Sequence, residues 1–376
     1  MSEVVTLTLE RVAHQGVVVG RCEGKVLFVS GGLPGERVRV EVTERGKSFD
    51  RGHVVEVLTA SPGRVEPPCP VADRCGGCDW QHASAEMERD LKTAVVAEQL
   101  SRLAGIEWQG SVQEVSPLIG WRTRMRYAVE DGRIGLRARR SHAVVELPDQ
   151  GCLIAAPGPE VGELRARARH AGEQVEVVVS DDRTTVLVDG AGGQEPVIQR
   201  VGERSYRLSA SGFWQVHPQA AALLTERVIA GLAPRPGEHA LDLYCGAGLF
   251  AGVLADRGCD VFGIELSHQA VSAARRNVPE ARFLASPLER ALNRLPRAAD
   301  VVVLDPPRKG AGRGVVRAVA GTRPRAIAYV ACDPSALGRD LRHFADAGYH
   351  AVSVEAFNLF PNTHHVECVA ILHPAA

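Results

Sequence analysis

His239-Ala-Leu-Asp-Leu-Tyr-Cys-Gly-Ala-Gly248 is the stretch of sequence that determines the fold. Its apolar half predicts a buried strand, and its glycine-containing half predicts a loop that opens a helix. Gly246 and Gly248 carry no Cβ, so the backbone of this loop can approach a ligand closely. From about residue 219 onward, strands alternate with helices, which is typical of a doubly wound parallel sheet. We therefore expect an α/β domain over residues 211–376.

An acidic residue ends the next predicted strand. This strand covers residues 259–264, and Glu265 follows it, about twenty residues after the glycine loop. A carboxylate there can accept hydrogen bonds from both hydroxyls of a ribose, as in several cofactors that contain adenosine. The third glycine of a dinucleotide fingerprint is missing, because residues 249–251 are Leu-Phe-Ala. A pyrophosphate cradle is therefore not expected, and S-adenosylmethionine fits the pattern better.

Length and composition limit the classes of protein. The chain has 376 residues, of which 45% are apolar, and this suits two or three domains rather than one small core. No apolar run reaches the length of a membrane span, and the N-terminal residues lack the hydrophobic core of a signal peptide. A soluble, cytoplasmic protein is therefore expected. The net charge of -1 excludes a uniformly basic nucleic-acid coat, so any nucleic-acid surface must be a local patch.

The N-terminal part of the chain has a different pattern. Residues 1–60 alternate apolar and polar positions in short runs separated by Gly/Pro turns, which predicts a small antiparallel β-barrel. After a Pro-containing linker, residues 61–210 combine a group of cysteines, a helix expected over 85–104, and further strands. This pattern indicates an α+β central domain. We thus expect three domains, with boundaries near residues 60 and 210.

Two predicted strand ends in the α/β domain carry reactive side chains. Cys332 ends an apolar run that stops at Pro334, and Asp305 opens the sequence Asp-Pro-Pro-Arg, 27 residues earlier. Ligands of open α/β sheets bind outside the carboxyl ends of the strands, so this thiol and this carboxylate should face one crevice. Cys332 is then a candidate nucleophile. The alternative is an ordinary buried cysteine, which is the commoner role of this residue type.

A thiol in such a crevice suits methylation of a pyrimidine carbon. C5 of uracil is a poor nucleophile, and a thiolate that adds first at C6 pushes electron density onto C5. The C5 proton must then be removed before the thiol can leave, which requires a general base. Glu367, at the end of the loop Phe360-Pro-Asn-Thr-His-His-Val-Glu, is the candidate, with a solvated strand end as its alternative. His364 and His365 are interpreted as supporting or RNA-contacting groups, although their spacing alone does not exclude them as the base.

Six motifs follow one another along the chain. They are Phe213-Trp-Gln215, Asp-Leu-Tyr244-Cys-Gly-Ala-Gly, Glu265, Asp305-Pro-Pro-Arg, Cys332-Asp-Pro and Phe-Pro-Asn-Thr-His-His-Val-Glu367. This order resembles the RNA uridine-5-methyltransferase family, which includes bacterial 23S rRNA and tRNA 5-methyluridine synthases, and the resemblance spans nearly the whole chain. The resemblance implies a Rossmann-like methyltransferase domain with a nucleophile at Cys332 and a base at Glu367. It also implies contacts to S-adenosylmethionine from four residues, namely Gln215, Tyr244, Glu265 and Asp305.

The chain departs from the family pattern at two positions. Asp333 stands where the family usually has Asn after the nucleophile, and Leu249 stands where a polar residue is frequent. The polar contacts near the target base and near the methionine part of the cofactor are therefore left open by the resemblance.

Three of the nine cysteines form a short cluster. Cys69, Cys75 and Cys78 have the spacing C-x5-C-x2-C, and Cys152 is a candidate fourth ligand from a distant turn. Four thiolates admit zinc or an iron–sulfur cluster, and three clustered cysteines with one remote cysteine favour the latter. The arrangement is similar to the 4Fe-4S site of the rRNA branch of the family, and we expect a structural role. Unrelated free thiols are the third interpretation. The isolated cysteines are interpreted as packing residues; they are Cys22, Cys245, Cys259 and Cys368.

One segment offers a local basic patch. Arg122, Arg124 and Arg126 alternate along a predicted strand and should therefore project from one face. Residues 121–140 hold seven arginines against one Glu and one Asp, the sharpest charge asymmetry in the chain. Such arginines can bind phosphates and stack on splayed bases, so we predict an RNA-binding surface there rather than a solvated face. The N-terminal barrel resembles the TRAM domain, an oligonucleotide-binding-like RNA module.

These features predict an enzyme that methylates C5 of a specific uridine in structured RNA through a covalent bond between Cys332 and C6. The barrel and the cysteines favour 23S rRNA, and uridine 54 of tRNA is the alternative. A radical methylthiotransferase is disfavoured because its cluster has the spacing C-x3-C-x2-C. A noncatalytic RNA-binding factor is disfavoured by the presence of both Cys332 and Glu367. Methylation of cytosine stays open because Asp333 offers a carboxylate for N3. We expect a monomer.

Overall fold

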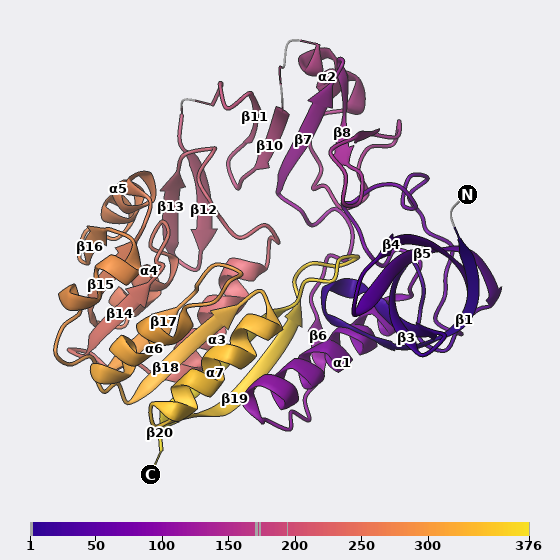
Figure 1. Cartoon of the computed structure of the whole chain (residues 1–376). Helices are drawn as coiled ribbons and strands as arrows, with labels where there is room; N and C mark the ends of the chain where they lie inside the picture. The colour runs from indigo at the N-terminus through magenta and orange to yellow at the C-terminus, as the bar shows by residue number, and fades with distance from the viewer. Residues whose placement is uncertain (1–2, 170–171, 173, 194, 376) are drawn as a thin grey trace.

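The computed structural model describes residues 3–169, 172, 174–193 and 195–375 (Figure 1). It contains a β-barrel at the N-terminus, an α+β region in the middle of the chain and a large α/β sheet at the C-terminus. The fold class expected from the sequence is confirmed, whereas the domain boundaries at residues 60 and 210 stay predictions. In the described part of the chain, no helix is both long and apolar enough to cross a membrane.

Residues 3–59 form a closed five-stranded barrel in the order β1-β2-β3-β5-β4. Its elements are β1 (Val4–Val12), the 3-10 helix η1 (His14–Gly16), β2 (Val18–Cys22), β3 (Lys25–Ser30), β4 (Arg37–Arg45) and β5 (Phe49–Thr59). Alternation explains the barrel, because Val38 and Val40 of β4 are fully buried whereas Arg37 and Arg39 face outward. The expectation of purely antiparallel pairing is wrong at one place, where β3 and β5 run parallel. A closed ring of five strands cannot alternate in direction throughout, because five is an odd number.

The C-terminal region is built on a sheet with the order β16-β15-β14-β17-β18-β20-β19-β6. Its strands are β14 (His239–Leu243), β15 (Asp260–Glu265), β16 (Arg282–Ala285), β17 (Val301–Leu304), β18 (Ala326–Ala331), β19 (Tyr349–Asn358), β20 (Glu367–Pro374) and β6 (Val112–Glu114). The strands from β16 to β18 are parallel, as expected for a doubly wound sheet. β20 runs antiparallel to both β18 and β19.

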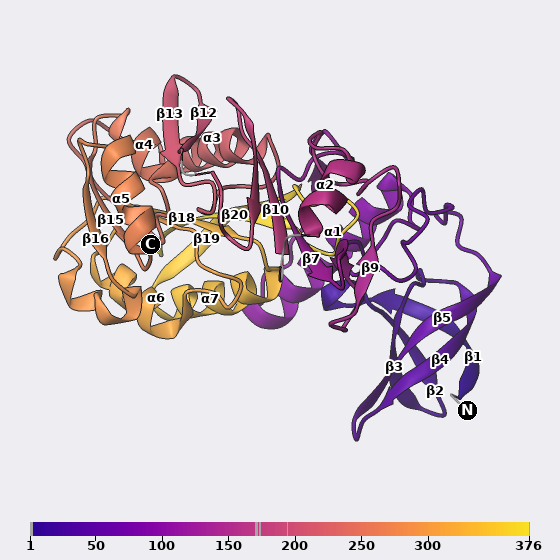
Figure 2. The same cartoon turned by 90° about the horizontal axis from the view of Figure 1, so that it is seen from above.

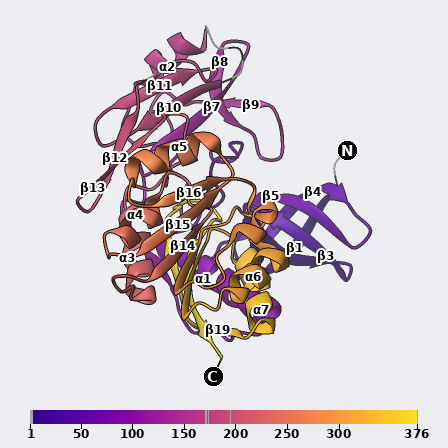
Figure 3. The same ribbon diagram turned by 90° about the vertical axis from the view of Figure 1, so that its left-hand side faces the viewer.

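Helices cover both faces of this sheet (Figure 3). They are α3 (Ala220–Leu232), α4 (Leu249–Ala255), α5 (His268–Asn277), α6 (Gly312–Gly321) and α7 (Pro334–Asp346), with the 3-10 helices η2 (Leu288–Arg290) and η3 (Leu292–Arg294). All four residues of β17 are fully buried, as is typical of a central parallel strand. Val301 and Val303 pack with α3, α4 and α5, whereas Val302 and Leu304 pack with α6 and α7. The carboxyl ends of these strands therefore meet at one edge between the two helical layers.

The middle region contains a five-stranded sheet in the order β11-β10-β7-β8-β9. Its elements are β7 (Arg124–Glu130), β8 (Arg133–Arg137), β9 (Val144–Glu146), α2 (Val161–Ala168), β10 (Gln174–Val179) and β11 (Thr184–Val188), followed by the ribbon of β12 (Val197–Val201) and β13 (Arg204–Leu208). Leu164 of α2 packs with Met125 and Tyr127 of β7 in one apolar cluster. Seen from above, the barrel and the α/β sheet lie at opposite ends of the molecule, with α1 and α2 between them (Figure 2).

Helix α1 (Ala85–Ala104) has the bounds expected from the sequence. Ser84 caps it by accepting a hydrogen bond from the backbone N–H of Met87 at 3.2 Å, and Gly105 ends it with a φ of 70°. The helix packs against α7, and β6, which follows it, pairs with β19. The first elements of the middle region are therefore built onto the C-terminal sheet.

A buried ion pair ties α1 to the β19–β20 loop, which comprises residues 359–366. The Lys92 ammonium is fully buried, 2.8 Å from the Glu88 carboxylate, and donates to Asn358 Oδ1 at 2.6 Å and to the carbonyl of Phe360 at 3.1 Å. Glu88 in turn accepts from the backbone N–H of Asn362 at 3.0 Å. The charges are paired and hydrogen-bonded, so their burial is tolerated and the loop is fixed to the helix.

Replacing Lys92 with Ala should destabilise the enzyme strongly, because Glu88 would then stay buried without its cation. We expect a loss of about 3–5 kcal/mol in the free energy of unfolding, measured by urea denaturation. Arg102→Ala on the same helix is the control, because the Arg102–Glu98 pair is exposed at 66% on the arginine side and should contribute less than about 1 kcal/mol. Equal losses for the two variants would contradict this account of the buried pair.

Candidate active site

A cavity of about 760 Å³ opens at the carboxyl ends of β14, β15, β17 and β18. It lies where an open α/β sheet is expected to bind its ligand, next to the point where the strand order reverses. The six residues expected to bind the cofactor or to react all line this cavity; they are Gln215, Tyr244, Glu265, Asp305, Cys332 and Glu367. The structure therefore brings together side chains that are up to 152 positions apart, counted from residue 215 to residue 367.

The loop after β14 forms one end of the cavity. Tyr244 adopts a φ of 65°, and Gly246 and Gly248 have φ values of 52° and 92°, so the chain turns sharply into α4. Both oxygens of the Glu265 carboxylate are oriented by backbone groups, because Oε2 accepts from Gly246 N at 3.2 Å and Oε1 accepts from Ser267 N at 2.8 Å. The Tyr244 hydroxyl is buried and has no hydrogen-bond partner among the described residues. This unpaired hydroxyl, the oriented carboxylate and the open loop fit a nucleoside-containing ligand.

Cys332 and Glu367 lie opposite each other at the other end of the cavity. β18 and β20 pair antiparallel with Ala331 across from Cys368, so one step further along the two strands Cys332 is across from Glu367. Residues that face each other across such a pair have Cβ atoms about 4.5–5.5 Å apart. The candidate nucleophile and the candidate base are therefore neighbours, although sequence reasoning could say only that both lie near strand ends.

The acidic groups of the cavity affect one another. Burial raises the pKa of Cys332 to about 12, and the negative charges of Glu367 and Asp305 add to this effect, whereas Arg308 opposes it. Burial and the charge of Asp305 also raise the pKa of Glu367 well above its usual value. Burial, together with Glu265, raises the pKa of Asp305 to about 7. The cavity is thus electrostatically favourable for a cation and unfavourable for two adjacent anions.

Asp333, which departs from the family pattern, is not among the residues that line this cavity. Its Oδ1 accepts from the backbone N–H of Ala336 at 2.8 Å and caps α7, and its Oδ2 lies 3.2 Å from Nε2 of His14 in the barrel. Burial opposes ionisation of Asp333, but the hydrogen bonds from His14 and Ala336 outweigh it and lower the pKa of this carboxyl. The side chain therefore joins the barrel to the start of α7.

The two histidines of the β19–β20 loop have different partners. His364 Nδ1 lies 2.7 Å from the carboxylate of Asp79, and His365 Nε2 lies 3.1 Å from the Arg308 guanidinium. Burial, reinforced by His364 and Arg308, lowers the pKa of His365 to about 3, so its ring is neutral and can accept from Arg308. His365 lines the cavity beside Glu367. Sequence reasoning did not identify Asp79 or His14, because their partners are distant in the chain.

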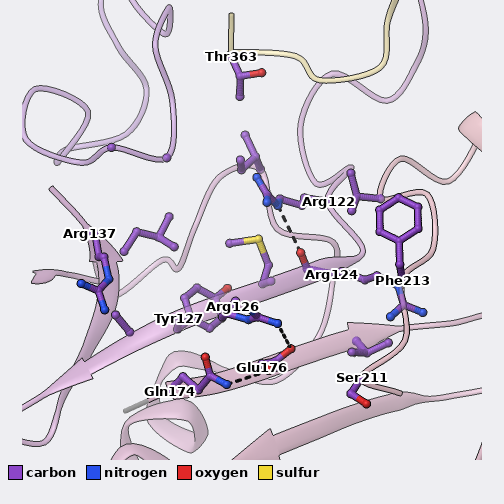
Figure 4. A pocket seen from close by; sticks show the side chains of 18 of the residues that line it. Arg122, Arg124, Arg126, Tyr127, Arg137, Gln174, Glu176, Ser211, Phe213 and Thr363 are labelled. Carbon is purple, nitrogen blue, oxygen red and sulfur yellow. Dashed lines mark hydrogen bonds and ion pairs between the residues drawn. The ribbon is translucent and has the colours of Figure 1, made fainter. Parts of the chain in front are cut away.

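A second cavity of about 930 Å³ adjoins the first and lies between β7, β10 and residues 210–214 (Figure 4). Arg122, Arg124 and Arg126 all line this second cavity. Arg122 and Phe213 line both cavities. Arg122 Nε donates to the carbonyl of Arg124 at 3.3 Å, and Arg126 pairs with Glu176 at 3.3 Å. Phe213 is 72% exposed between the two cavities. This hollow surface offers cationic groups and an aromatic face to one ligand.

Arg124 has a further contact that the sequence pattern did not indicate. Its Nη1 donates to the backbone carbonyls of Ala210 at 3.0 Å and Gly212 at 2.5 Å, whereas Nε and Nη2 are buried without a partner in the described part of the chain. Burial lowers the pKa of this guanidinium to about 10, with Glu176 opposing the shift. Arg124 therefore fixes the segment that leads to Gln215 in addition to lining the cavity.

The four cysteines of the expected cluster come from two separate loops and lie near one another. All four are free thiols. Burial raises the pKa of Cys75, and the nearby charges of Cys152 and Cys69 raise it further. In the residues that the structure describes, no group of three or more His, Cys, Asp or Glu side chains is arranged to hold a single metal ion. The loop is tied to the central sheet, because Arg139 Nη2 donates to the carbonyl of Cys78 at 2.8 Å.

Comparison with family models gives three matches along the chain. A TRAM domain matches residues 2–55, a general methyltransferase domain matches residues 241–305, and tRNA (uracil-5-)-methyltransferase matches residues 291–374. The structure also resembles the crystal structure of Pyrococcus abyssi tRNA (uracil-54, C5)-methyltransferase in complex with S-adenosyl-L-homocysteine. The TM-score is 0.76 at 23% identity, and the match covers 98% of this chain and 100% of that one. At this identity the likeness shows the fold alone.

Relatives of similar length carry the family assignment. A protein of Streptomyces avermitilis described as an uncharacterized RNA methyltransferase is 44% identical, over 100% of this chain and 99% of its own length. A protein of Streptomyces coelicolor with the same description is 45% identical, over 97% of this chain and 92% of its own length. This chain belongs to the family of RNA methyltransferases that combine a TRAM domain with a uracil-5-methyltransferase domain.

Proposed function

We propose that this enzyme methylates C5 of a uridine in structured RNA, by way of a covalent bond between Cys332 and C6 of the uracil. The observation that carries the proposal is the register of β18 and β20, which pairs a thiol with a carboxylate at the end of one cavity. A nucleophile for C6 and a base for the C5 proton are the two groups that this reaction requires.

The cofactor end of the cavity suits S-adenosylmethionine, which supplies an electrophilic methyl group when bound. Glu265 offers two oriented carboxylate oxygens for ribose hydroxyls, and the buried Tyr244 hydroxyl has a free hydrogen-bonding capacity. Asp305 and Glu367 make the intervening space favourable for a positively charged sulfonium. The solved relative bound to S-adenosyl-L-homocysteine supports the same ligand class.

The residues of the cavity would act in a fixed order. The Cys332 thiol gives its proton to water, and the thiolate, which Arg308 favours, forms a bond to C6, so that the electron pair of the C5–C6 double bond becomes available at C5. C5 takes the methyl group and then carries both a methyl group and a proton. Glu367 removes that proton, the double bond forms again, and the sulfur leaves with its electron pair. The register of β18 and β20 supports this role, because it brings the carboxylate across the strand pair from Cys332.

RNA is the substrate class indicated by the family, and the second cavity is the surface that we propose for it. Arg122 and Arg126 can bind phosphates there, and the exposed Phe213 offers a face for stacking at the entrance to the first cavity. We propose 23S rRNA as the target, supported by the TRAM barrel together with the four cysteines. Uridine 54 of tRNA is the second candidate, favoured by the family description and by the fold neighbour.

Cytosine is the less favoured base. An enzyme that methylates cytosine needs an acid beside the nucleophile to protonate N3, and Asp333 was the candidate for this role. Its carboxylate instead contacts His14 and the N-terminus of α7, and its pKa is lowered, which leaves it ionised and engaged elsewhere. This arrangement supports uracil as the target.

We also propose that Cys69, Cys75, Cys78 and Cys152 hold a 4Fe-4S cluster. The four thiols converge from two loops, but they are not arranged around one ion. A four-iron cluster keeps its thiolates farther apart than a tetrahedral zinc ion, whose Zn–S bonds are about 2.3 Å long. Such a cluster would link the loop at residues 69–78 to the turn at residue 152, which is a structural role.

Deleting the gene should remove 5-methyluridine from one position in 23S rRNA, as measured by mass spectrometric mapping of rRNA and tRNA.

Replacing Cys332 with Ala should abolish complementation of the deletion strain, because this change removes the nucleophile. Glu367→Gln should still transfer the methyl group but release RNA about 10²–10⁴-fold more slowly, because the general base is lost. The complex would then remain as an RNA–protein band on denaturing gels. Loss of the methyl group from tRNA alone would favour the second candidate, and loss of 5-methylcytidine would contradict the uridine proposal.

Glu367→Gln should also stabilise the fold in a pH-dependent manner. The folded state raises the pKa of Glu367, so the contribution of this carboxyl to stability is present below its usual pKa and is lost as the pH rises through the raised value. Glutamine cannot ionise. The midpoint of thermal unfolding of the variant should therefore exceed that of the wild type by a few degrees at about pH 9, and by less at about pH 5. A difference independent of pH would contradict the raised pKa.

Protein purified without oxygen should be brown and contain about four iron and four sulfide ions per chain. Cys78→Ser should lose the colour and the iron because it removes one of the four ligands. Cys22→Ser, in the barrel, is the control and should keep both. Colourless protein with one zinc ion per chain would overturn the cluster assignment.

A further inference from the structure

The loop that carries the cysteines makes direct contact with the β19–β20 loop. Asp79, which follows Cys78, accepts two hydrogen bonds on Oδ2, one from the backbone N–H of His364 at 2.9 Å and one from its Nδ1 at 2.7 Å. The carbonyl of Asn362 accepts from the backbone N–H groups of Asp79 at 2.8 Å and Trp80 at 3.1 Å. These hydrogen bonds join segments that are 285 residues apart, and the two side chains are only 20% and 25% exposed.

This contact lies at the entrance to β20. The His364 ring contacts the His365 ring at a tilt of 45°, with 4.0 Å between ring centroids, and His365 lines the same cavity as Cys332 and Glu367. Glu367 is the first residue of β20, three positions after His364. The place where Asp79 holds His364 therefore affects how the chain enters β20, in addition to the pairing of Glu367 with Phe357 of β19.

Cys332 and Glu367 are held by different parts of the fold. Cys332 follows β18, whose position is set by its buried neighbours β17 and β20 in the sheet. Glu367 follows a loop, and that loop is anchored by Lys92 on one side and by Asp79 on the other. Removing the Asp79 anchor should therefore displace the end of the β19–β20 loop more than it displaces β18.

We propose that Asp79 is a positioning residue for the proton-removal step: by holding His364 it sets the Glu367 carboxylate at the C5 proton of the methylated uridine. This inference rests on the proposed function and adds to it a role in the reaction for the cysteine-bearing loop. Bond formation by Cys332 and methyl transfer come before the proton is removed. Loss of Asp79 therefore slows the release of RNA from the covalent complex more than it slows formation of that complex.

The test uses the full-length enzyme, S-adenosylmethionine with a labelled methyl group, and total RNA from a strain that lacks the gene. Single-turnover reactions follow two quantities, the methyl groups transferred to RNA and the fraction of RNA in covalent complex on denaturing gels. Asp79→Ala should transfer methyl groups at nearly the wild-type rate and release RNA about tenfold or more slowly, so that the complex accumulates. Asp73→Ala, which removes a 75% exposed carboxylate from the same loop, is the matched control and should behave as the wild type.

Two further variants separate positioning from folding. Asp79→Asn keeps an acceptor oxygen for the N–H of His364 and should recover most of the release rate. His364→Ala removes the partner of Asp79 and should accumulate the complex as Asp79→Ala does, even if the latter variant folds poorly. Hydrogen exchange of residues 359–366, measured by mass spectrometry, should be faster in Asp79→Ala than in Asp73→Ala.

The outcomes distinguish this inference from the function on which it rests. If the wild type methylates uridine but Asp79→Ala and His364→Ala release RNA as fast as the wild type, only the positioning role is rejected. Equal slowing of complex formation and release in both variants also rejects it, because a general loss of structure would act on both steps. Failure of the wild type to transfer a methyl group to any uridine would reject the proposed function and the positioning role together.

Discussion

The antiparallel pairing of β18 with β20 is the constraint on which the candidate active site depends. Parallel strands present only their carboxyl ends at the ligand edge of an α/β sheet, so every side chain there follows a strand. β20 runs the other way, and its first residue therefore arrives at the same edge as the residue after β18. A slip of one residue in this register would turn Glu367 to the opposite face of the sheet. The buried, apolar β18 and β20 hold the register against such a slip.

The sequence predicted well those features that depend on local patterns. The bounds of α1 were expected at residues 85–104, where the structure has Ser84 and Gly105 as its caps, and the positions of Asp305 and Cys332 followed from the rule that parallel strands end at one edge. In each case the decisive residues lie within one element or at its end. Short-range physical chemistry is then sufficient, because burial and capping act within a few residues of the chain.

Features that depend on long-range pairing could not be predicted in this way. The contact of Asp79 with His364, the hydrogen bond of Lys92 to Asn358 and the contact of His14 with Asp333 each join parts of the chain that no periodicity relates. The parallel pairing of β3 with β5 became evident only from closure of the barrel. Similarly, the spacing of the arginines placed three of them on one surface, but it could not indicate that Arg124 also binds two backbone carbonyls.

The charges of the cavity impose an order on the proposed reaction. A thiolate at Cys332 and a carboxylate at Glu367 each oppose the ionisation of the other, because both are buried and adjacent. Arg308 favours the thiolate, so a protonated Glu367 is compatible with attack on C6. Addition of the sulfur to C6 moves its negative charge onto the uracil ring, and this charge is neutralised when C5 takes a methyl group from a sulfonium. One obstacle to ionisation of Glu367 is then removed, so the carboxylate can form after methyl transfer, which is when the C5 proton has to be taken. The same two groups that oppose each other in the free enzyme thus act in sequence during the reaction.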